Sequence, residues 1–249
     1  MEKSILTFDH VTGLGRRFSP QNWGFKNAAS RKFVLQDISF DLKAGYIYGL
    51  MGENGAGKTT LMHYILKDNI SYEGHIFIEG TDIRTGHAQL LNRVGYVSED
   101  RQFFENCTAA QNAEILGGFY ENFYKKTFLD IMDSMNLPAD KVYRTMSRGE
   151  RLKFQLAFAI AHEPCLYLLD EVTAGMDPVF RIDFFQILQQ IIMDERACVL
   201  MTSHISSEIE TRTDYVGVME NGCLAAFGES LDMIPRLKNR GRTGDERNR

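Results

Sequence analysis

The chain has 249 residues, of which 44% are hydrophobic and 24% are charged, and its formal net charge at pH 7 is −5. These proportions are typical of a globular protein with a full hydrophobic core. The acidic balance disfavours nucleic acid as the main ligand, because phosphate backbones bind basic surfaces. No apolar run approaches the roughly 20 residues of a membrane helix. The first residues do not resemble a signal peptide, so we expect no membrane span.

Short β-prone runs separated by glycine or polar turns open the sequence and predict strands at residues 5–11, 34–42, 46–51, 75–79 and 93–97. Residues 13–31 break this pattern and are interpreted as an inserted loop or hairpin. The four cysteines show no metal-binding spacing. Two of them, Cys165 and Cys198, lie in apolar strand-like runs, where we expect buried, reduced thiols.

Residues 52–59 fit the phosphate-loop pattern G-x-x-x-x-G-K-[ST] and read Gly52, Glu53, Asn54, Gly55, Ala56, Gly57, Lys58 and Thr59. The glycines let backbone N–H groups converge on phosphate oxygens, while the lysine supplies a positive charge and the Thr59 hydroxyl a ligand for Mg²⁺. A β-prone run at residues 44–51 precedes the loop, and a predicted helix at about 57–67 follows it. Because strand, loop and helix are the required context, we favour a nucleoside triphosphate site over a chance glycine turn.

Residues 101–144 carry apolar side chains at helical spacing, and we expect them to form an inserted helical block that packs on itself. The expected core positions are Ile115, Phe119, Phe123, Phe128, Met132 and Met135.

Strand-like and helix-like segments then alternate, with strands at residues 166–169 and 198–202 and helices at 179–193 and 205–211. This alternation predicts a largely parallel sheet with crossover helices. Asp170 and Glu171 end the first of these strands, at the sheet edge where such folds bind ligands. We expect Asp170 to hold Mg²⁺ through water, and Glu171 to orient and deprotonate the attacking water.

Residues 146–150, Met-Ser-Arg-Gly-Glu, resemble the Leu-Ser-Gly-Gly-Gln signature of ABC-type ATPases when taken with the phosphate loop and the Asp-Glu strand. Ser147 and Glu150 also have the spacing of a capping box for a helix at 151–161. The resemblance implies that Ser147, Arg148 and Gly149 contact the γ-phosphate of ATP held by a second subunit.

Three further segments are similar to motifs of the same family. Residues 173–177 resemble the loop that crosses the dimer interface, with Asp177 in its usual place and also suited to cap a helix that begins at Pro178. His204 stands where the family's switch histidine contacts the γ-phosphate. Residues 95–99 resemble the segment that usually ends in glutamine and links Mg²⁺ and water to the membrane partner; here it ends in Glu99.

The sequence departs from the family pattern at Arg148, at Glu150 and at Glu99, which replace glycine, glutamine and glutamine. Arg148 adds a cation that would face triphosphate across the dimer. Glu99 adds a charge that could bind Mg²⁺ directly or repel phosphate. The adenine-stacking aromatic is obscured by the insertion; among Phe18, Trp23, Phe25 and Phe33 we favour Phe18.

The resemblance implies an α/β P-loop NTPase fold with a mostly parallel core sheet, an N-terminal antiparallel β-subdomain and an inserted α-helical subdomain at about 101–162. The ABC ATPase domain is expected to cover residues 1–235, and the tail at 236–249, rich in Arg, Asn and Gly, to be disordered.

The expected function is that of the ATPase subunit of an ABC transporter, with ATP and Mg²⁺ bound at residues 52–60. It would form a head-to-tail homodimer at the cytoplasmic face of the membrane, on a permease encoded as a separate chain. The motifs resemble bacterial exporters of the peptide or antibiotic-resistance kind. Two alternatives remain open: a soluble ABC ATPase of translation, iron–sulphur assembly or DNA maintenance, and a regulatory module that closes on ATP but hydrolyses it poorly.

Overall fold

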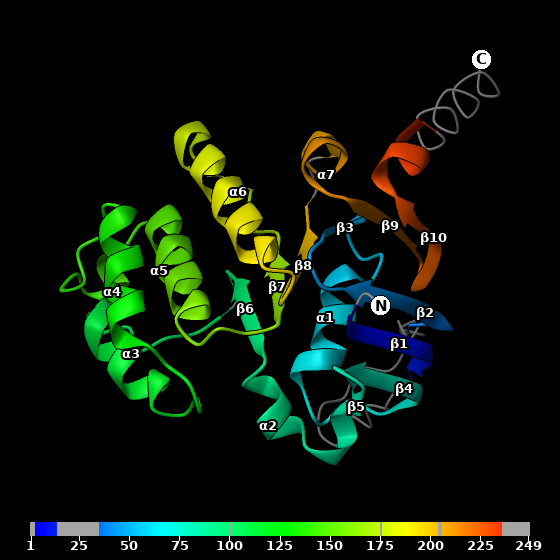
Figure 1. The fold of residues 1–249 in the computed structure, drawn as a ribbon, viewed down its shortest axis with the longest axis horizontal. Helices are drawn as coiled ribbons and strands as arrows, with labels where there is room; N and C mark the ends of the chain where they lie inside the picture. Colours follow the sequence, from blue (N-terminus) through cyan, green and yellow to red (C-terminus); the bar gives the residue numbers. More distant parts are fainter. Residues whose placement is uncertain (1–2, 14–34, 100, 175, 204–205, 236–249) are drawn as a thin grey trace, which may run out of the picture.

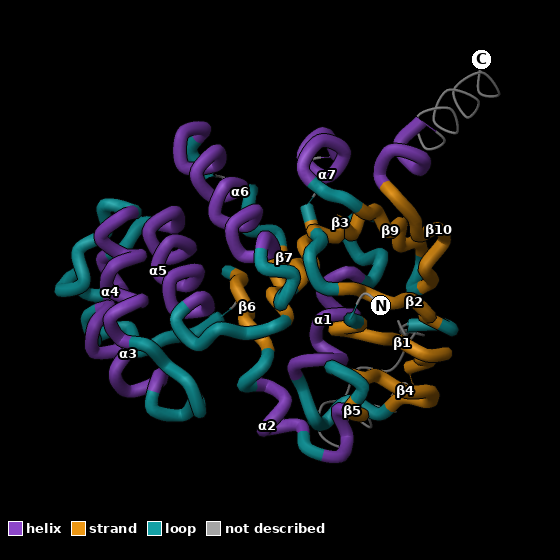
Figure 2. Tube along the Cα trace, viewed as in Figure 1, coloured by secondary structure: helices purple, strands orange, loops and turns teal. Residues whose placement is uncertain are grey.

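The computed structural model describes residues 3–13, 35–99, 101–174, 176–203 and 206–235. Two β-sheets lie side by side, and helices surround the larger one (Figures 1 and 2). The helices within residues 109–160 gather at the end of the molecule away from the smaller sheet (Figure 1).

The larger sheet has six strands in the order β10-β9-β3-β8-β7-β6. Its strands are β3 (Ile47–Met51), β6 (Val94–Ser98), β7 (Leu166–Asp170), β8 (Cys198–Thr202), β9 (Tyr215–Glu220) and β10 (Cys223–Glu229). All neighbours are parallel except β10, which pairs antiparallel with β9. Every residue of β7 and β8 is buried, as continuous apolar runs in a parallel sheet require. The predicted, mostly parallel core sheet is confirmed.

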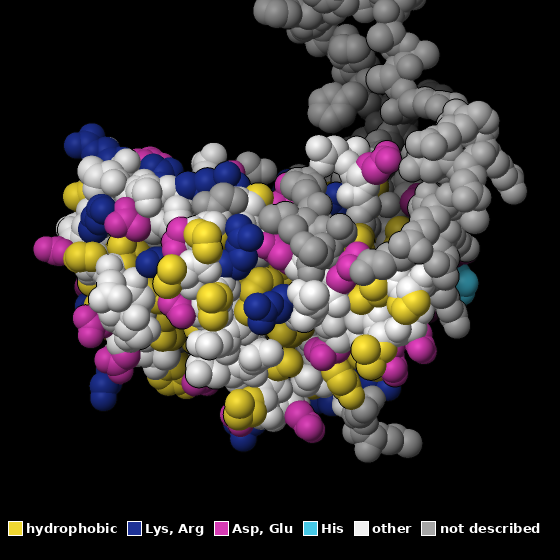
Figure 3. Space-filling model, turned by 90° about the horizontal axis from the view of Figure 1, so that it is seen from above, with side chains coloured by type: hydrophobic (Ala, Val, Ile, Leu, Met, Phe, Trp, Pro, Cys, Tyr) yellow, Lys and Arg dark blue, Asp and Glu magenta, His cyan; other side chains and the backbone are white. Residues whose placement is uncertain are grey.

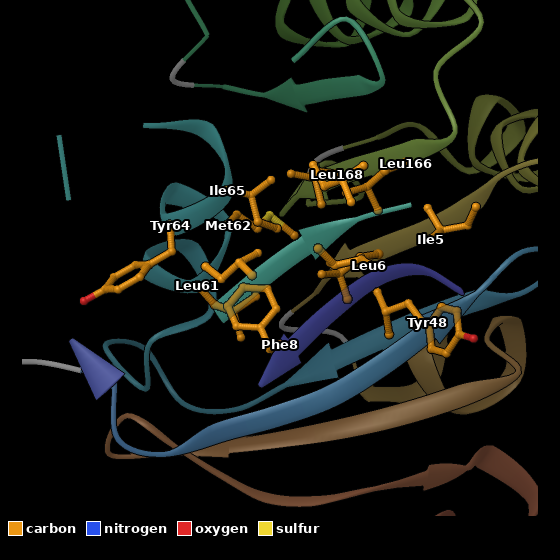
Figure 4. Close-up of a cluster of buried hydrophobic side chains, with 14 of the residues drawn as sticks. Ile5, Leu6, Phe8, Tyr48, Leu61, Met62, Tyr64, Ile65, Leu166 and Leu168 are labelled. Atoms are coloured by element: carbon orange, nitrogen blue, oxygen red, sulfur yellow. The ribbon is translucent and has the colours of Figure 1, made fainter. Parts of the chain in front are cut away.

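The smaller sheet is antiparallel, in the order β2-β1-β4-β5, and confirms the expected N-terminal β-subdomain. It consists of β1 (Ser4–Gly13), β2 (Ile38–Lys43), β4 (Tyr72–Ile78) and β5 (Thr81–Asp82). Helix α1 (Lys58–Leu66) lies between the sheets. In Figure 4, Phe8 of β1, Leu61 of α1 and Leu168 of β7 point into one apolar cluster, so one core joins both sheets to the helix that follows the phosphate loop.

Helices α3 (Ala109–Gly117), α4 (Lys125–Ser134) and α5 (Arg148–Ile160) stand between β6 and β7 in the chain and confirm the expected helical insertion. Their own cluster contains Phe103, Phe128, Phe154 and Phe158. The core prediction is wrong for Ile115 and Phe119, which are 46% and 79% exposed. Small residues form the buried face of α3, and Phe119 lies beyond the helix end, where helical spacing no longer applies.

The remaining helices are α2 (His87–Leu91), α6 (Pro178–Met193) and α7 (Ser206–Arg212), with 3₁₀ turns η1 (Ile83–Thr85) and η2 (Tyr143–Thr145). The sequence did not predict α2 or the β9–β10 hairpin. None of the described helices combines the length and the apolarity that crossing a bilayer requires. Cys165 and Cys198 are buried and unbridged, as expected, and burial raises the pKa of the Cys165 thiol to about 11. Domain limits 1–235 stay a prediction, and residues 236–249 lie outside the described part.

Candidate nucleotide site

The phosphate loop begins directly after β3 and ends at Thr59, the second residue of α1. Gly52, Gly55 and Gly57 have φ angles of 155°, 81° and 117°, which side-chain-bearing residues adopt only with strain. A Cβ atom at Gly52 would also come within 2.5 Å of the Met219 carbonyl oxygen. The glycines are therefore needed for the loop conformation itself.

Lys58 is folded into this loop. Its side chain is 4% exposed, and Nζ donates hydrogen bonds to the carbonyl oxygens of Gly52 at 2.7 Å and Glu53 at 3.1 Å. Beside it lies a cavity of about 300 Å³ lined by Asn54, Gly55, Gly57, Lys58, Thr59, Thr60 and Glu171. In the described part of the chain, no side chain caps the N-terminus of α1, and the first turn of α1 contains no acidic residue. Its N-terminal N–H groups thus fit an anion.

The β9–β10 hairpin supports the loop from behind. Gly222 N–H donates to the Ala56 carbonyl at 2.9 Å, and Gln36 N–H donates to the Gly222 carbonyl at 2.9 Å. A larger cavity of about 800 Å³ is lined by residues 51–56, by Ser203 and by hairpin residues 218–221. Sequence reasoning missed this support; the Asn221-Gly222 turn between two β-prone runs was the signal that could have revealed it.

Thr202 of β8 fixes the two acidic residues at the end of β7. Its hydroxyl donates to Asp170 Oδ1 at 2.7 Å and accepts from the Glu171 backbone N–H at 3.0 Å. Asp170 is 6% exposed, whereas Glu171 lines the phosphate-loop cavity. The structure therefore brings Glu171 together with Lys58 and Thr59, although the chain separates them widely.

The oxygen donors at this edge suit Mg²⁺, which prefers a few protein ligands together with substrate phosphate oxygens. Thr59 offers a hydroxyl and Asp170 a carboxylate. Within the described part of the chain, no group of three or more His, Cys, Asp or Glu residues could hold a metal alone. Thr59 and Asp170 fit Mg²⁺ held together with phosphate oxygens of a ligand.

Ser147 is the N-cap residue of α5 and forms the predicted capping box. The Glu150 N–H donates to Ser147 Oγ at 3.3 Å, and the Ser147 N–H donates to Glu150 Oε2 at 2.9 Å. Glu150 also pairs with Lys141 Nζ at 2.7 Å, and this hydrogen bond lowers the pKa of its carboxyl group. Glu150, which replaces glutamine in the signature, thus stabilises the start of the helix.

Arg148 and Glu99 form an ion pair through Nε and Oε1. They line a separate cavity of about 350 Å³ with Arg151, Leu152 and Gln155, whereas Glu99 does not line the phosphate-loop cavity. The expected contact of Glu99 with Mg²⁺ therefore gains no support from its position. Gln155 Oε1 accepts from the Ser98 N–H at 3.0 Å, which ties α5 to the end of β6.

Asp177 caps α6, as predicted. Its Oδ1 accepts from the N–H groups of Val179 at 3.1 Å and Phe180 at 2.9 Å. Its role at a dimer interface stays a prediction. His204 and Phe18, expected at the γ-phosphate and the adenine, lie outside the described residues.

A series of buried side-chain hydrogen bonds, which the sequence did not predict, begins at Thr173, two residues after Glu171. Thr173 Oγ1 lies 3.2 Å from Ser203 Oγ, which donates to Glu208 Oε2 at 3.1 Å. Glu208 in turn pairs with Arg181 of α6 at 3.1 Å. These contacts connect the segments that follow β7 and β8 with α6 and α7.

The model of the family described as ABC transporter matches residues 35–174. The ABC transporter ATP-binding protein YtrB of Bacillus subtilis is 31% identical over 191 residues, which cover 77% of this chain and 65% of YtrB. The bacitracin transport ATP-binding protein BcrA of Enterococcus faecalis is 32% identical over 193 residues, covering 77% of this chain and 63% of BcrA. The matches thus span slightly less than two thirds of these relatives.

A solved structure described as the ATP binding subunit of an ABC transporter has the same fold. Its TM-score is 0.80 at 22% identity, over 94% of this chain and 93% of that chain. With the phosphate loop, the acidic strand end and the capped signature helix in place, the chain belongs to the ABC transporter family of ATP-binding proteins.

Proposed function

We propose that the protein binds ATP with Mg²⁺ and hydrolyses it as the ATP-binding subunit of an ABC transporter whose permease is a separate chain. The observation that carries this proposal is the single cavity shared by the phosphate loop and Glu171. It combines phosphate-binding groups with a carboxylate that can serve as a base.

The loop residues from Gly52 to Thr60 hold the phosphates through backbone N–H groups, the Lys58 ammonium and the N-terminus of α1. On phosphate binding, the Lys58 ammonium exchanges its contacts with backbone carbonyls for phosphate oxygens. Phe18 is the proposed stacking partner of the adenine.

Thr59 and Asp170 would hold Mg²⁺, which neutralises negative charge on the phosphate oxygens when bound. Glu171 accepts the proton of the attacking water, and its backbone is fixed for this by the hydrogen bond to Thr202. His204, which follows β8 in the sequence, is proposed to contact the γ-phosphate.

A second, identical copy would complete the site by placing Ser147, Arg148 and Gly149 over the same phosphates, with Asp177 at the interface. Ser147 and Arg148 are exposed at the start of α5, so a partner can reach them. The positive end of the α5 dipole favours such an anion. Closure on ATP and opening after hydrolysis would then move the permease between two states.

The helical subdomain offers a docking surface for the permease. Ile115 and Phe119 are exposed there. A cavity of about 430 Å³ between α1, β6 and the end of α3 is lined by residues that include Leu66, Tyr96 and Tyr120. This cavity is also lined by His63, Lys67 and Arg101, and such a mixed groove on a subdomain with exposed apolar side chains suits a short amphipathic partner helix. Docking would hold the protein at the cytoplasmic face of the membrane.

We propose export of a peptide or antibiotic-like compound, supported by the similarity to a bacitracin transport protein. Nucleic acid is not a proposed ligand, because the net charge is −5. Acidic, basic and hydrophobic side chains are also interspersed on the face shown in Figure 3.

Glu171→Gln tests the hydrolytic part of the proposal. We expect ATP turnover to fall by about 10²–10⁴-fold, because the base is lost while the side-chain size is kept. ATP binding, measured with a fluorescent nucleotide, should remain. Glu163→Gln, in a turn away from the cavity, is the matched control. Parental turnover in Glu171→Gln would show that another group acts as the base.

Purification of the full chain in mild detergent from its native cell tests the partner. We expect a multi-span membrane protein to co-purify at equal stoichiometry, as mass spectrometry would show. Co-purification with ribosomal or scaffold proteins alone would contradict the transporter assignment and favour a soluble ABC ATPase.

A further inference from the structure

Two residues that depart from the family pattern contact each other. Arg148, the first residue of α5, forms an ion pair with Glu99, which directly follows β6. Both side chains are about half exposed, at 49% and 47%. The pair joins the signature end of the helical subdomain to the core sheet of the same chain.

The electrostatics of this helix end favour an anion, and Glu99 already supplies one. Carboxylates near the N-terminus of a helix are stabilised by its dipole, whereas a cation in the first turn is disfavoured. Glu99 therefore both neutralises Arg148 and places a negative charge where a phosphate would approach. A phosphate at the same helix end must compete with Glu99 for the guanidinium and is repelled by its carboxylate.

We propose that Glu99 is a positioning residue that restrains Arg148 until the triphosphate held by a second copy displaces it. Arg148 then exchanges the carboxylate of its own chain for phosphate oxygens across the interface. The exchange sets the nucleotide concentration at which two copies associate. This inference rests on the proposed ATP-bound dimer.

A neighbouring ion pair on the same helix provides a matched control. Arg151 pairs with Glu105 at 3.4 Å, and the Arg151 guanidinium also lies over the Tyr143 ring at 4.6 Å from its centroid. Like Glu99, Glu105 belongs to the segment between β6 and α3 and is about half exposed, at 54%. Glu105→Gln therefore removes the same charge from the same region without freeing Arg148.

The experiment measures association of the full chain by sedimentation velocity while a non-hydrolysable ATP analogue and Mg²⁺ are titrated. Glu99→Gln should lower the midpoint concentration roughly two- to fivefold, as expected for release of an exposed ion pair. Arg148→Ala should raise the midpoint, and adding Glu99→Gln to Arg148→Ala should produce no further shift. Glu105→Gln should behave as the parent, and circular dichroism should show all variants folded.

Each alternative result has a distinct meaning. If Glu99→Gln lowers the midpoint equally in the parent and in Arg148→Ala, the restraint on Arg148 is overturned. The same holds if Glu105→Gln lowers the midpoint as much as Glu99→Gln does. Either result would mean that the glutamates act only by repelling the negatively charged nucleotide. A higher midpoint in Glu99→Gln would overturn the restraint in favour of a metal role for Glu99. If the parent binds the analogue but never associates, the proposed dimer fails and the restraint with it. If the parent does not bind the analogue, the proposed ATP site itself is wrong.

Discussion

The two halves of the proposed site are held in different ways. At the edge of the core sheet, Asp170 and Glu171 are fixed by Thr202, and a second set of buried hydrogen bonds joins Thr173 and Ser203 to Glu208. At the signature end of the helical subdomain, exposed ion pairs hold Arg148 and Arg151. Buried hydrogen bonds are costly to leave unmade, whereas exposed ion pairs contribute only about 0–1 kcal/mol and exchange readily.

This difference suits a site assembled from two subunits. In the proposed dimer, the core edge would hold its groups in one position for chemistry, while the signature end would release its contacts when the second copy arrives. Rigidity is therefore expected at Asp170 and Glu171, and exchange of contacts at the start of α5.

The largest expected effect tests whether the helical subdomain can lose stability without disturbing the core sheet and its phosphate loop. Phe154 is fully buried and its ring contacts Phe103, Phe128, Tyr143 and Phe158. Phe154→Ala should reduce the free energy of unfolding by about 3–5 kcal/mol, because it leaves a cavity in this cluster. Chemical denaturation measures the loss, with the exposed Phe119→Ala as control. Fluorescent ATP binding at the phosphate loop should persist; its loss would show that the regions do not fold independently.

Acid should lower the free energy of unfolding through His162, which packs in the helical subdomain. This residue is 2% exposed just beyond α5, and burial lowers its pKa from 6.5 to about 4. Between these values the unfolded chain binds the proton and the folded chain does not, so stability falls as pH falls. The loss is about 1.4 kcal/mol per pH unit, or about 3 kcal/mol in total.

Denaturation curves at several pH values measure this slope. In His162→Gln the slope between about pH 6.5 and about pH 4 should be smaller than in the parent. His10, whose side chain is 75% exposed, is the control. Its hydrogen bond to Asp37 raises its pKa above 6.5, so between about pH 6.5 and about pH 4 it is protonated in both the folded and the unfolded chain, and His10→Gln should keep the parental slope in that range. An unchanged slope in His162→Gln would place the acid-sensitive group elsewhere.

A smaller effect is expected at the core edge. Thr202→Val keeps the shape of the side chain but leaves Asp170 Oδ1 and the Glu171 N–H without the hydroxyl between them. We expect a loss of about 1–3 kcal/mol of stability and a lower ATPase rate. Thr145→Val, which removes an exposed hydroxyl bonded to the Val142 carbonyl, is the control. Unaltered turnover in Thr202→Val would indicate that the acidic pair does not depend on buried support.

Features encoded by neighbouring residues could be predicted from the sequence. The phosphate loop needs its glycines at fixed positions, and the caps at Ser147 and Asp177 depend on residues two or three positions away. The parallel sheet followed from buried apolar runs alternating with helices.

Features that join distant parts of the chain could not be predicted in the same way. The Arg148–Glu99 pair and the Thr202 bridge depend on which strands become neighbours, and sequence spacing does not encode that order. The periodicity of Ile115 and Phe119 could not reveal whether another element would cover them. The hairpin beside the phosphate loop was missed because its second strand, β10, contains no buried residue and so lacks the continuous apolar pattern of β7 and β8.

Glu171 has a φ angle of +54°, a left-handed conformation that glycine or asparagine adopts more readily than glutamate. Glutamate at this position therefore costs about 1 kcal/mol of stability relative to glycine. Selection for thermal stability alone would drive this position towards glycine and extinguish ATP turnover. Heat-tolerant variants of this protein should accordingly be screened for activity at every round, because one of the simplest stabilising substitutions lies at the proposed base itself.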